Sequence, residues 1–194
     1  MSNYKIDNKL TLADFIEIEN IEHTYFENDN ITNANEVWKW YTKNKLTCVA
    51  VRDKNSNLVG SINILPINEK VFNDIYNDKI NESSIVAEDI LQYEDNSLYY
   101  MYLSSISIKK ELLNNYELIT TLLKGALELL NILENRNITI KKIMADASTI
   151  HGEKICKKLL KMDYITETSH NSKIYCSSGE NFYKEIERLK KCFI

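Results

Sequence analysis

Cysteine and histidine side chains are the first candidates for chemistry in this sequence, because both types bind metals and take part in proton or group transfer. They are Cys48, Cys156, Cys176, Cys192, His23, His151 and His170. The cysteines are far apart and form no Cys-x-x-Cys pair, and the histidines show no ligand spacing. We therefore predict reduced thiols and no metal site.

Carboxylates are the second group of side chains that could take part in chemistry, and they gather in the segment from 68 to 96. The acidic residues of interest are Glu82, Glu88, Asp89, Glu94 and Asp95. Such a segment fits a cationic partner on electrostatic grounds, for example a polyamine, an aminoglycoside or a lysine-bearing peptide. The ordinary alternative is a solvated acidic loop.

Length, charge and composition restrict the class of protein. The chain has 194 residues, 44% of them hydrophobic, with only four glycines and one proline, which predicts one globular domain over 1–194. A net charge of −4 gives no global positive field for nucleic acid. No apolar run approaches about 18 residues, and the first residues lack the apolar core of a signal peptide. We expect a soluble cytoplasmic protein with no membrane partner, for which a homodimer is one option.

The residue pattern predicts a mixed α/β order of elements that would hold these side chains in place. Helices are expected at about 12–26, 33–44, 71–75, 116–134, 152–161 and 181–191. Strands are expected at 46–52, 58–65, 97–108, 138–147, 164–168 and 173–177. Thr11 is placed to cap the first helix, and Pro66 is expected to end the second strand. Alternation puts Tyr100 and Tyr102 on one face of the long strand and Tyr99 on the other.

Three stretches narrow this pattern to a family. They are Val49–Asp53 continuing through Leu58–Ile62, then Leu103–Glu111, then Ala145–Ser148 with Gly152–Leu159. In this order and spacing the sequence resembles the successive motifs of the GNAT acetyltransferase superfamily over about residues 3–177. The resemblance implies a twisted mixed sheet, splayed in the middle and flanked by helices. It also implies an N-acetyltransferase that uses acetyl-coenzyme A and an amine acceptor of unknown identity.

The same resemblance assigns residues to the cofactor. Pantetheine would pair with the strand residues Ser105, Ile106, Ser107 and Ile108, much as an added β-strand does. The pyrophosphate would meet N–H donors where the following helix begins. That stretch comprises Asn114, Asn115, Tyr116, Glu117 and Leu118.

This phosphate loop contains no glycine, which departs from the family pattern. If Asn114 caps the helix, Glu117 takes the third helical position, and its carboxylate would compete with a bound pyrophosphate. Glu117→Gln would then tighten coenzyme A binding. The alternative is a non-catalytic GNAT-fold binding or interaction protein that has lost the cofactor loop. A third option keeps the fold with another acyl donor.

Amine acetylation also needs groups that handle charge and protons. A backbone N–H around Leu103 to Ser105 is the candidate for stabilising the developing oxyanion. Family members often use a helix tyrosine for the leaving thiolate, but 155–159 has none, so Cys156 is nearest to that slot and Tyr164 is the next tyrosine downstream. The candidate bases are Glu88, Asp89, Glu94, Asp95 and His151, and a water chain to solvent would also serve.

Overall fold

The computed structural model describes residues 2–25 and 31–193 and contains one seven-stranded sheet. The strands are β1 (Tyr4–Asp7), β2 (Cys48–Asp53), β3 (Leu58–Ile67), β4 (Leu98–Ile108), β5 (Thr139–Ala147), β6 (Asp163–Glu167) and β7 (Lys173–Ser178). Their order across the sheet is β1-β2-β3-β4-β5-β7-β6. β4 and β5 run parallel, whereas the other neighbouring pairs run antiparallel.

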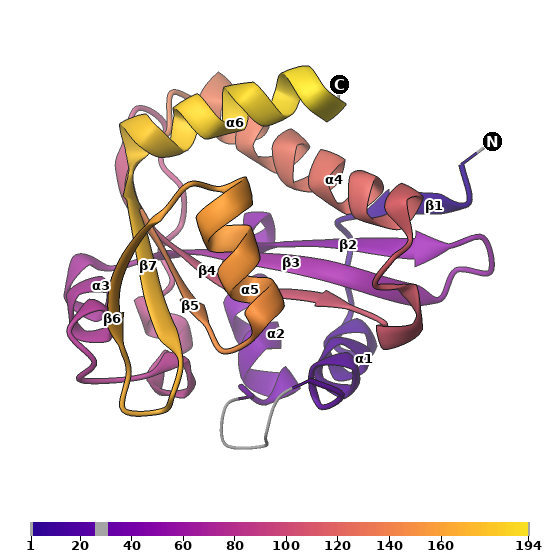
Figure 1. Cartoon of the computed structure of the whole chain (residues 1–194), viewed down its shortest axis with the longest axis horizontal. Coiled ribbons are helices and arrows are strands. Elements are labelled where there is room, and N and C mark those ends of the chain that lie inside the picture. Colours follow the sequence, from indigo (N-terminus) through magenta and orange to yellow (C-terminus); the bar gives the residue numbers. More distant parts are fainter. Residues whose placement is uncertain (1, 26–30, 194) are drawn as a thin grey trace.

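Helices cover both faces of this sheet (Figure 1). They are α1 (Leu12–Glu22), α2 (Ala34–Lys43), α3 (Glu69–Tyr76), α4 (Tyr116–Asn135), α5 (Ile150–Lys154) and α6 (Gly179–Phe193). α4 and α6 pack on one face, and α1, α2 and α3 pack on the other. The mixed, helix-flanked sheet expected from the sequence is thereby confirmed.

The centre of the sheet is splayed. β4 and β5 pair up to Leu103 and Ala145 and then separate. At the same place the register between β3 and β4 shifts, so that Ile64 pairs with Leu103 while Asn63 pairs with Ser105. Ser104 is therefore the extra residue of a β-bulge, which bends a strand and redirects its side chains. The bulge lies where the two central strands part.

The apolar helix α4 closes one side of the splay. Its buried leucines belong to the main hydrophobic core, together with residues of β2, β3 and β4. Gly125 allows the close approach, because a Cβ at this position would lie 2.5 Å from Cγ1 of Val49. The expected faces of the tyrosine cluster are confirmed: Tyr99 lies in this core, and Tyr102 lies in the core on the opposite face.

One strand was not predicted from the sequence, and one expectation about strands is wrong. β1 was not expected, because four residues carry little periodic signal, yet it pairs with β2 at the edge of the sheet. Pro66 does not end β3, which continues to Ile67. The carbonyl of Pro66 accepts from Leu91 N–H at 2.8 Å. Its backbone polar groups therefore face away from β4, and the missing N–H costs that ladder no bond.

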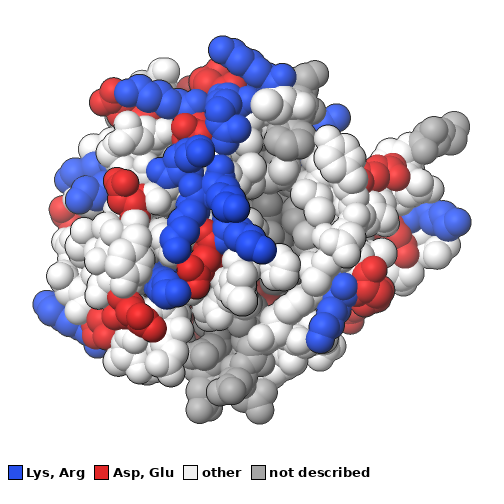
Figure 2. All heavy atoms as spheres, viewed as in Figure 1, with Lys and Arg blue, Asp and Glu red and all other residues white. Residues whose placement is uncertain are grey.

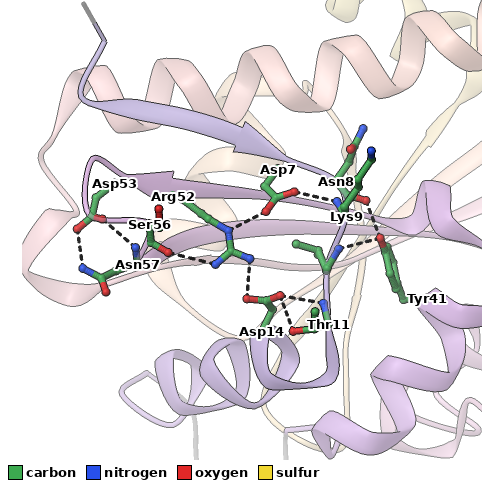
Figure 3. A network of polar contacts seen from close by, with 11 residues as sticks. Asp7, Asn8, Lys9, Thr11, Asp14, Tyr41, Arg52, Asp53, Ser56 and Asn57 are labelled. Carbon is green, nitrogen blue, oxygen red and sulfur yellow. Dashed lines mark hydrogen bonds and ion pairs between the residues drawn. The ribbon is translucent and has the colours of Figure 1, made fainter.

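Arg52 connects β1, α1 and β2, as Figure 3 shows. Its guanidinium donates to Asp7 and to Asp14, each at 2.7 Å. Burial raises the pKa of Asp14, but hydrogen bonds from Thr11 and Arg52 outweigh it, so that the pKa is lowered. We call Asp7, Asp14 and Arg52 the Arg52 cluster. In this cluster the positive charge that faces the two carboxylates is the guanidinium of Arg52, a residue of the same chain.

Candidate functional site

A cavity of about 550 Å³ opens where β4 and β5 separate. One wall is apolar and is formed by α4, by Leu113 just before it, and by η6. η6 (Ile155–Leu159) is a π-helical turn that continues α5. The apolar lining residues are Leu113, Ile119, Leu122, Leu123, Ile155 and Leu159. This half, called the α4 half below, can hold an elongated chain with apolar segments.

The edge of β4 that faces this gap carries backbone groups. Lys109 N–H donates to Val59 of β3, so the alternation of a strand turns the polar groups of Ile108 and Ile106 toward the gap. Ile108 accepts a hydrogen bond from the Tyr25 hydroxyl at 2.7 Å, in agreement with this orientation. An amide chain lying in the cavity could therefore pair with the strand edge.

The other half of the cavity, called the acidic half below, contains three carboxyl groups from three elements. Glu22 ends α1, Glu82 begins the short helix η3 (Glu82–Ser84), and Asp146 lies in β5. All three line the cavity. We call them the carboxyl trio. Their side of the sheet carries α1, α2 and α3, opposite the face on which α4 packs.

Glu82 has the most perturbed carboxyl group of the trio. Ser104, the bulge residue, donates its hydroxyl to Oε1 of Glu82 at 2.9 Å. Burial, supported by the nearby charge of Glu22, raises the pKa of Glu82 to about 8 despite this hydrogen bond. A carboxyl with such a pKa exchanges its proton near neutral pH, as a general base must.

Glu22 and Asp146 are perturbed in the same direction. The Ser107 hydroxyl donates to Oε1 of Glu22 at 2.8 Å, but burial raises the pKa of Glu22. Burial also raises the pKa of Asp146, although Ser172 offers it a hydrogen bond. Oδ1 of Asp146 is shielded from solvent and has no hydrogen-bond partner among the described residues. The acidic half therefore has unused acceptor capacity.

Lysines flank the α4 half. Lys154 and Lys158 line the cavity, and the exposed Lys157 and Lys161 lie close to them in sequence. In Figure 2 the basic side chains gather over the middle of the face, where α5 lies in Figure 1. The two halves of the cavity thus differ in charge, with lysines beside the apolar wall and carboxyls across the sheet.

The structure brings only some of the predicted cofactor residues to the cavity. Ser105, Ile106 and Ile108 line it, whereas Ser107 is buried against Glu22. The predicted phosphate loop lies outside the lining, and only the preceding Leu113 reaches it. The pyrophosphate role of Asn114, Asn115, Tyr116, Glu117 and Leu118 therefore stays a prediction.

The condition under which Glu117 would take the third helical position of α4 is not met. Asn115, and not Asn114, is the N-cap, and its side-chain oxygen accepts from Leu118 N–H at 3.0 Å. Glu117 consequently takes the second helical position. Its carboxylate turns toward the N-terminal segment, where it accepts from Asn3 N–H at 2.8 Å and from the Ser2 hydroxyl at 2.9 Å. The carboxylate is thus engaged by neutral donors away from the cavity.

The three predicted catalytic residues do not come together. Cys156 lines the cavity, but burial raises the pKa of its thiol to about 12. Tyr164 is about half exposed, packs edge-on against Tyr175 and is outside the cavity lining. Glu88 is exposed in η4 (Ala87–Asp89) and is also outside the lining. Their catalytic roles remain predictions, and only Cys156 has the required location.

The other candidate bases differ in whether they line the cavity. His151 lines the cavity, whereas Asp89, Glu94 and Asp95 do not. Asp89 accepts from Asn68, and Asp95 pairs with Arg136 at 2.7 Å. Sequence reasoning named Glu82 only as part of an acidic segment and missed Glu22 and Asp146. No spacing rule could have found them, because the trio is assembled from three distant segments.

Two further geometric observations concern the described residues, 2–25 and 31–193. None of their helices is long and apolar enough to span a membrane. No three or more of their histidine, cysteine, aspartate and glutamate side chains are grouped closely enough to hold a metal ion. The carboxyl trio therefore does not converge on a single point.

Comparison with known proteins adds the fold class. A scan of family models and a search of curated proteins each find no match. Among solved structures, the chain is similar to the GphF GNAT-like decarboxylase in complex with isobutyryl-CoA, with 9% identity, a TM-score of 0.60, and coverage of 90% of this chain and 98% of that one. A GNAT-family acetyltransferase from Listeria monocytogenes gives 10% identity, a TM-score of 0.50, and coverage of 90% and 94%.

A third similar structure has a name that indicates another activity. The C-terminal condensation domain of Ebony, in complex with beta-alanyl-dopamine, gives 12% identity, a TM-score of 0.54, and coverage of 92% of this chain and all of that one. The chain therefore has the GNAT fold, which the resemblance of its sequence motifs predicted. At these identities the likeness establishes the fold alone, since one fold serves several reactions.

Proposed function

We propose that this protein is an N-acetyltransferase that transfers the acetyl group of acetyl-coenzyme A to a primary amine. The observation that carries the proposal is the bulge at Ser104. It lies where β4 leaves β5, and the cavity at this point joins an apolar wall to the carboxyl trio. A thioester on one side of the sheet would there meet an amine from the other side.

The α4 half fits the coenzyme A arm. The backbone edge at Ile106 and Ile108 would pair with the pantetheine amides, and Ile119 and Leu122 would cover its apolar segments. Lys154 and Lys158 supply positive charge for phosphate groups. When bound, coenzyme A supplies an acyl carbon activated as a thioester.

Glu82 would act as the base. An ammonium group must lose a proton before its nitrogen can attack a carbonyl carbon, and a nearby carboxylate with a pKa of about 8 can accept it. A backbone N–H at the bulge would then donate to the carbonyl oxygen as that oxygen gains negative charge. The nitrogen still carries a surplus proton after the N–C bond forms, and the departing sulfur takes it as the C–S bond breaks.

This proton balance needs no acid from the protein. Cys156 keeps its proton at neutral pH because burial raises its pKa to about 12, far above that of an ordinary thiol. It would be a poor donor to a thiolate. We therefore assign Cys156 to the cavity wall in this proposal, and Glu82 replaces Glu88 as the base.

Binding and turnover of acetyl-coenzyme A test the proposal. The full chain is titrated calorimetrically with acetyl-coenzyme A, and acetylation of a panel of primary amines is followed by mass spectrometry. Ile119→Trp fills part of the apolar wall and should weaken binding at least tenfold. Lys124→Trp places the same bulk on an exposed position of the same helix and should leave binding unchanged.

One observation favours a second candidate, the non-catalytic GNAT-fold binding protein. Asn115 already occupies the Leu118 N–H, and the predicted loop residues stay outside the cavity lining. The same experiment decides between the two. Absence of binding heat and of a thermal shift at millimolar acetyl-coenzyme A would overturn the acetyltransferase proposal in favour of this alternative.

A further inference from the structure

We infer that the acceptor is an elongated amine with at least two ammonium groups, one that reacts beside Glu82 and one that is held by another carboxyl of the trio, Glu22 or Asp146. This inference deepens the proposed function and rests on it. It concerns only the acidic half of the cavity, which can be tested apart from the coenzyme A half.

The distribution of charge in the cavity is the first argument. The carboxyl trio comes from α1, η3 and β5, and all three groups line one continuous space. The lysines of the lining, Lys154 and Lys158, come from α5 and η6. Ile155 and Leu159 of that same segment pack against the core under α4. Among the described lining residues, the acidic half therefore contains no lysine or arginine.

Hydrogen-bonding capacity is the second argument. A carboxylate offers about four lone-pair sites, and an ammonium group offers three donors and no acceptor. Glu22 accepts from the hydroxyl of Ser107, which leaves most of its sites for a ligand. Oδ1 of Asp146 has no partner among the described residues, and a buried polar atom without a partner is costly. An ammonium group placed at either carboxyl would supply the donors that it lacks.

The three carboxyls are also spread out along the cavity. No three of the described acidic, histidine and cysteine side chains are grouped as metal ligands would be. A small inorganic cation would need several ligands around one point. An organic chain with separated charges can instead meet carboxyls at different places along one cavity. One of the three carboxyls serves the reacting nitrogen, and two remain for a second charge.

Several ionisable groups face the trio from the elements packed around it. Glu22 has Glu19, His23 and Glu82 near it, and Glu82 has Glu22 and Asp146 near it. The Tyr102 hydroxyl lies close to Glu82, and Asp78 and His170 lie close to Asp146. Acids outnumber bases in this set. Binding of a dication should therefore expel protons from the trio, and its affinity should rise from pH 6 to pH 8.

A matched pair of probes tests the inference. 1,4-Diaminobutane and butylamine have the same carbon chain and differ only in the second amino group. Each is titrated calorimetrically into the full chain in phosphate and in Tris buffer, whose different ionisation heats report released protons. We expect the diamine to bind at least tenfold more tightly than the monoamine, with net proton release and with an advantage that shrinks as salt rises.

Variants assign the second ammonium group. At least one of Glu22→Gln and Asp146→Asn should weaken diamine binding at least fivefold and leave butylamine binding nearly unchanged. Glu128→Gln removes a carboxylate from the exposed side of α4, outside the cavity, and serves as the control. Equal affinity for the two probes, or diamine binding that survives both cavity variants, would overturn the inference.

The same proteins separate this inference from the proposed function. If acetyl-coenzyme A binds and the two probes are acetylated equally well, the dication site is wrong and the acetyltransferase stands. If the diamine binds as expected but acetyl-coenzyme A gives no heat, the acetyltransferase is wrong, and the acidic half is a dication site of a binding protein.

Discussion

Two groups of carboxyls lie at the same sheet and behave in opposite ways. In the Arg52 cluster, Asp7 and Asp14 have lowered pKa values, and the guanidinium between them is 2.7 Å from each. In the carboxyl trio, all three pKa values are raised, and hydroxyl groups are the partners recorded for Glu22 and Glu82. Burial raises the pKa in both groups. The carboxylates of the Arg52 cluster differ because they also accept from backbone N–H groups, of Thr11 for Asp14 and of Lys9 for Asp7, and from the Arg52 guanidinium.

This contrast separates a structural role from a binding role. A carboxylate with an internal arginine has its partner in every state of the folded protein, so it supports the fold. A buried carboxyl without such a partner weakens the fold when it ionises, but it can accept a proton or a cation from outside.

Glu82→Gln should lower the rate of amine acetylation by about 10²–10⁴-fold, the usual contribution of a general base. Glutamine is nearly the same size and can still meet the Ser104 hydroxyl, so acetyl-coenzyme A affinity should be unchanged. Steady-state rates and calorimetry on the same samples measure the two effects. Glu128→Gln is the matched control. A comparable loss in Glu88→Gln, with Glu82→Gln fully active, would restore the base predicted from sequence.

Arg52→Met should destabilise the fold by about 2 kcal/mol at neutral pH, because Asp7 and Asp14 lose their shared cation. This is below the roughly 3–5 kcal/mol typical of a broken, fully buried pair, since the Arg52 side chain is 23% exposed. Urea denaturation measures the change. Lys184→Met removes an exposed i,i+4 pair and should destabilise the fold far less than Arg52→Met does. Equal losses in both variants would refute the structural role of the cluster.

The pH dependence of stability should have opposite signs in the two groups. Glu82 has its pKa raised from 4.5 to about 8, so its contribution to stability is lost as pH rises across that interval. Asp7 and Asp14 have lowered pKa values, so their contribution is lost as pH falls below 3.8. Glu82→Gln should therefore melt at a higher temperature than the natural chain at pH 8, and at the same temperature at pH 4. A higher melting temperature for the natural chain at pH 8 would contradict the assignment.

Glu117→Gln should have the smallest effect. Its carboxylate lies at the surface and is bonded to Ser2 and Asn3, so the melting temperature should fall only slightly. Coenzyme A affinity should not change, because the carboxylate turns away from the cavity. Calorimetry at two salt concentrations checks this. Tighter binding at low salt would instead support the competition predicted from sequence.

The sequence predicts the fold better than the site. Periodicity along the chain places the long helix α4 and the long strand β4 within a residue or two, because each has a dense, regular apolar pattern. The four-residue β1 was missed because its pairing with β2 depends on tertiary contacts. The expected start of α4 at Tyr116 agrees with Asn115 as its N-cap, whereas the alternative with Asn114 as the cap does not.

The carboxyl trio could not be predicted from sequence. Glu22 occupies the last position of a surface helix and lies in no motif. Asp146 lies in the stretch Ala145–Ser148 that carries part of the family resemblance, but the resemblance gave it no role. Glu82 was visible only as one acid among several, and its burial depends on how η3 folds over Ser104. Motif spacing predicts where strands part, but it does not predict which distant side chains meet there.

The pH profile of acetyl transfer tests the central claim most directly. The rate constant kcat/KM is measured from pH 6 to pH 9 with acetyl-coenzyme A and 1,4-diaminobutane for the natural chain, Glu82→Gln and Glu128→Gln. The account predicts that the natural chain and Glu128→Gln show a rise with a midpoint near pH 8, the pKa of Glu82, and that Glu82→Gln loses this inflection and stays low. Profiles that coincide in shape and height for all three proteins would contradict it.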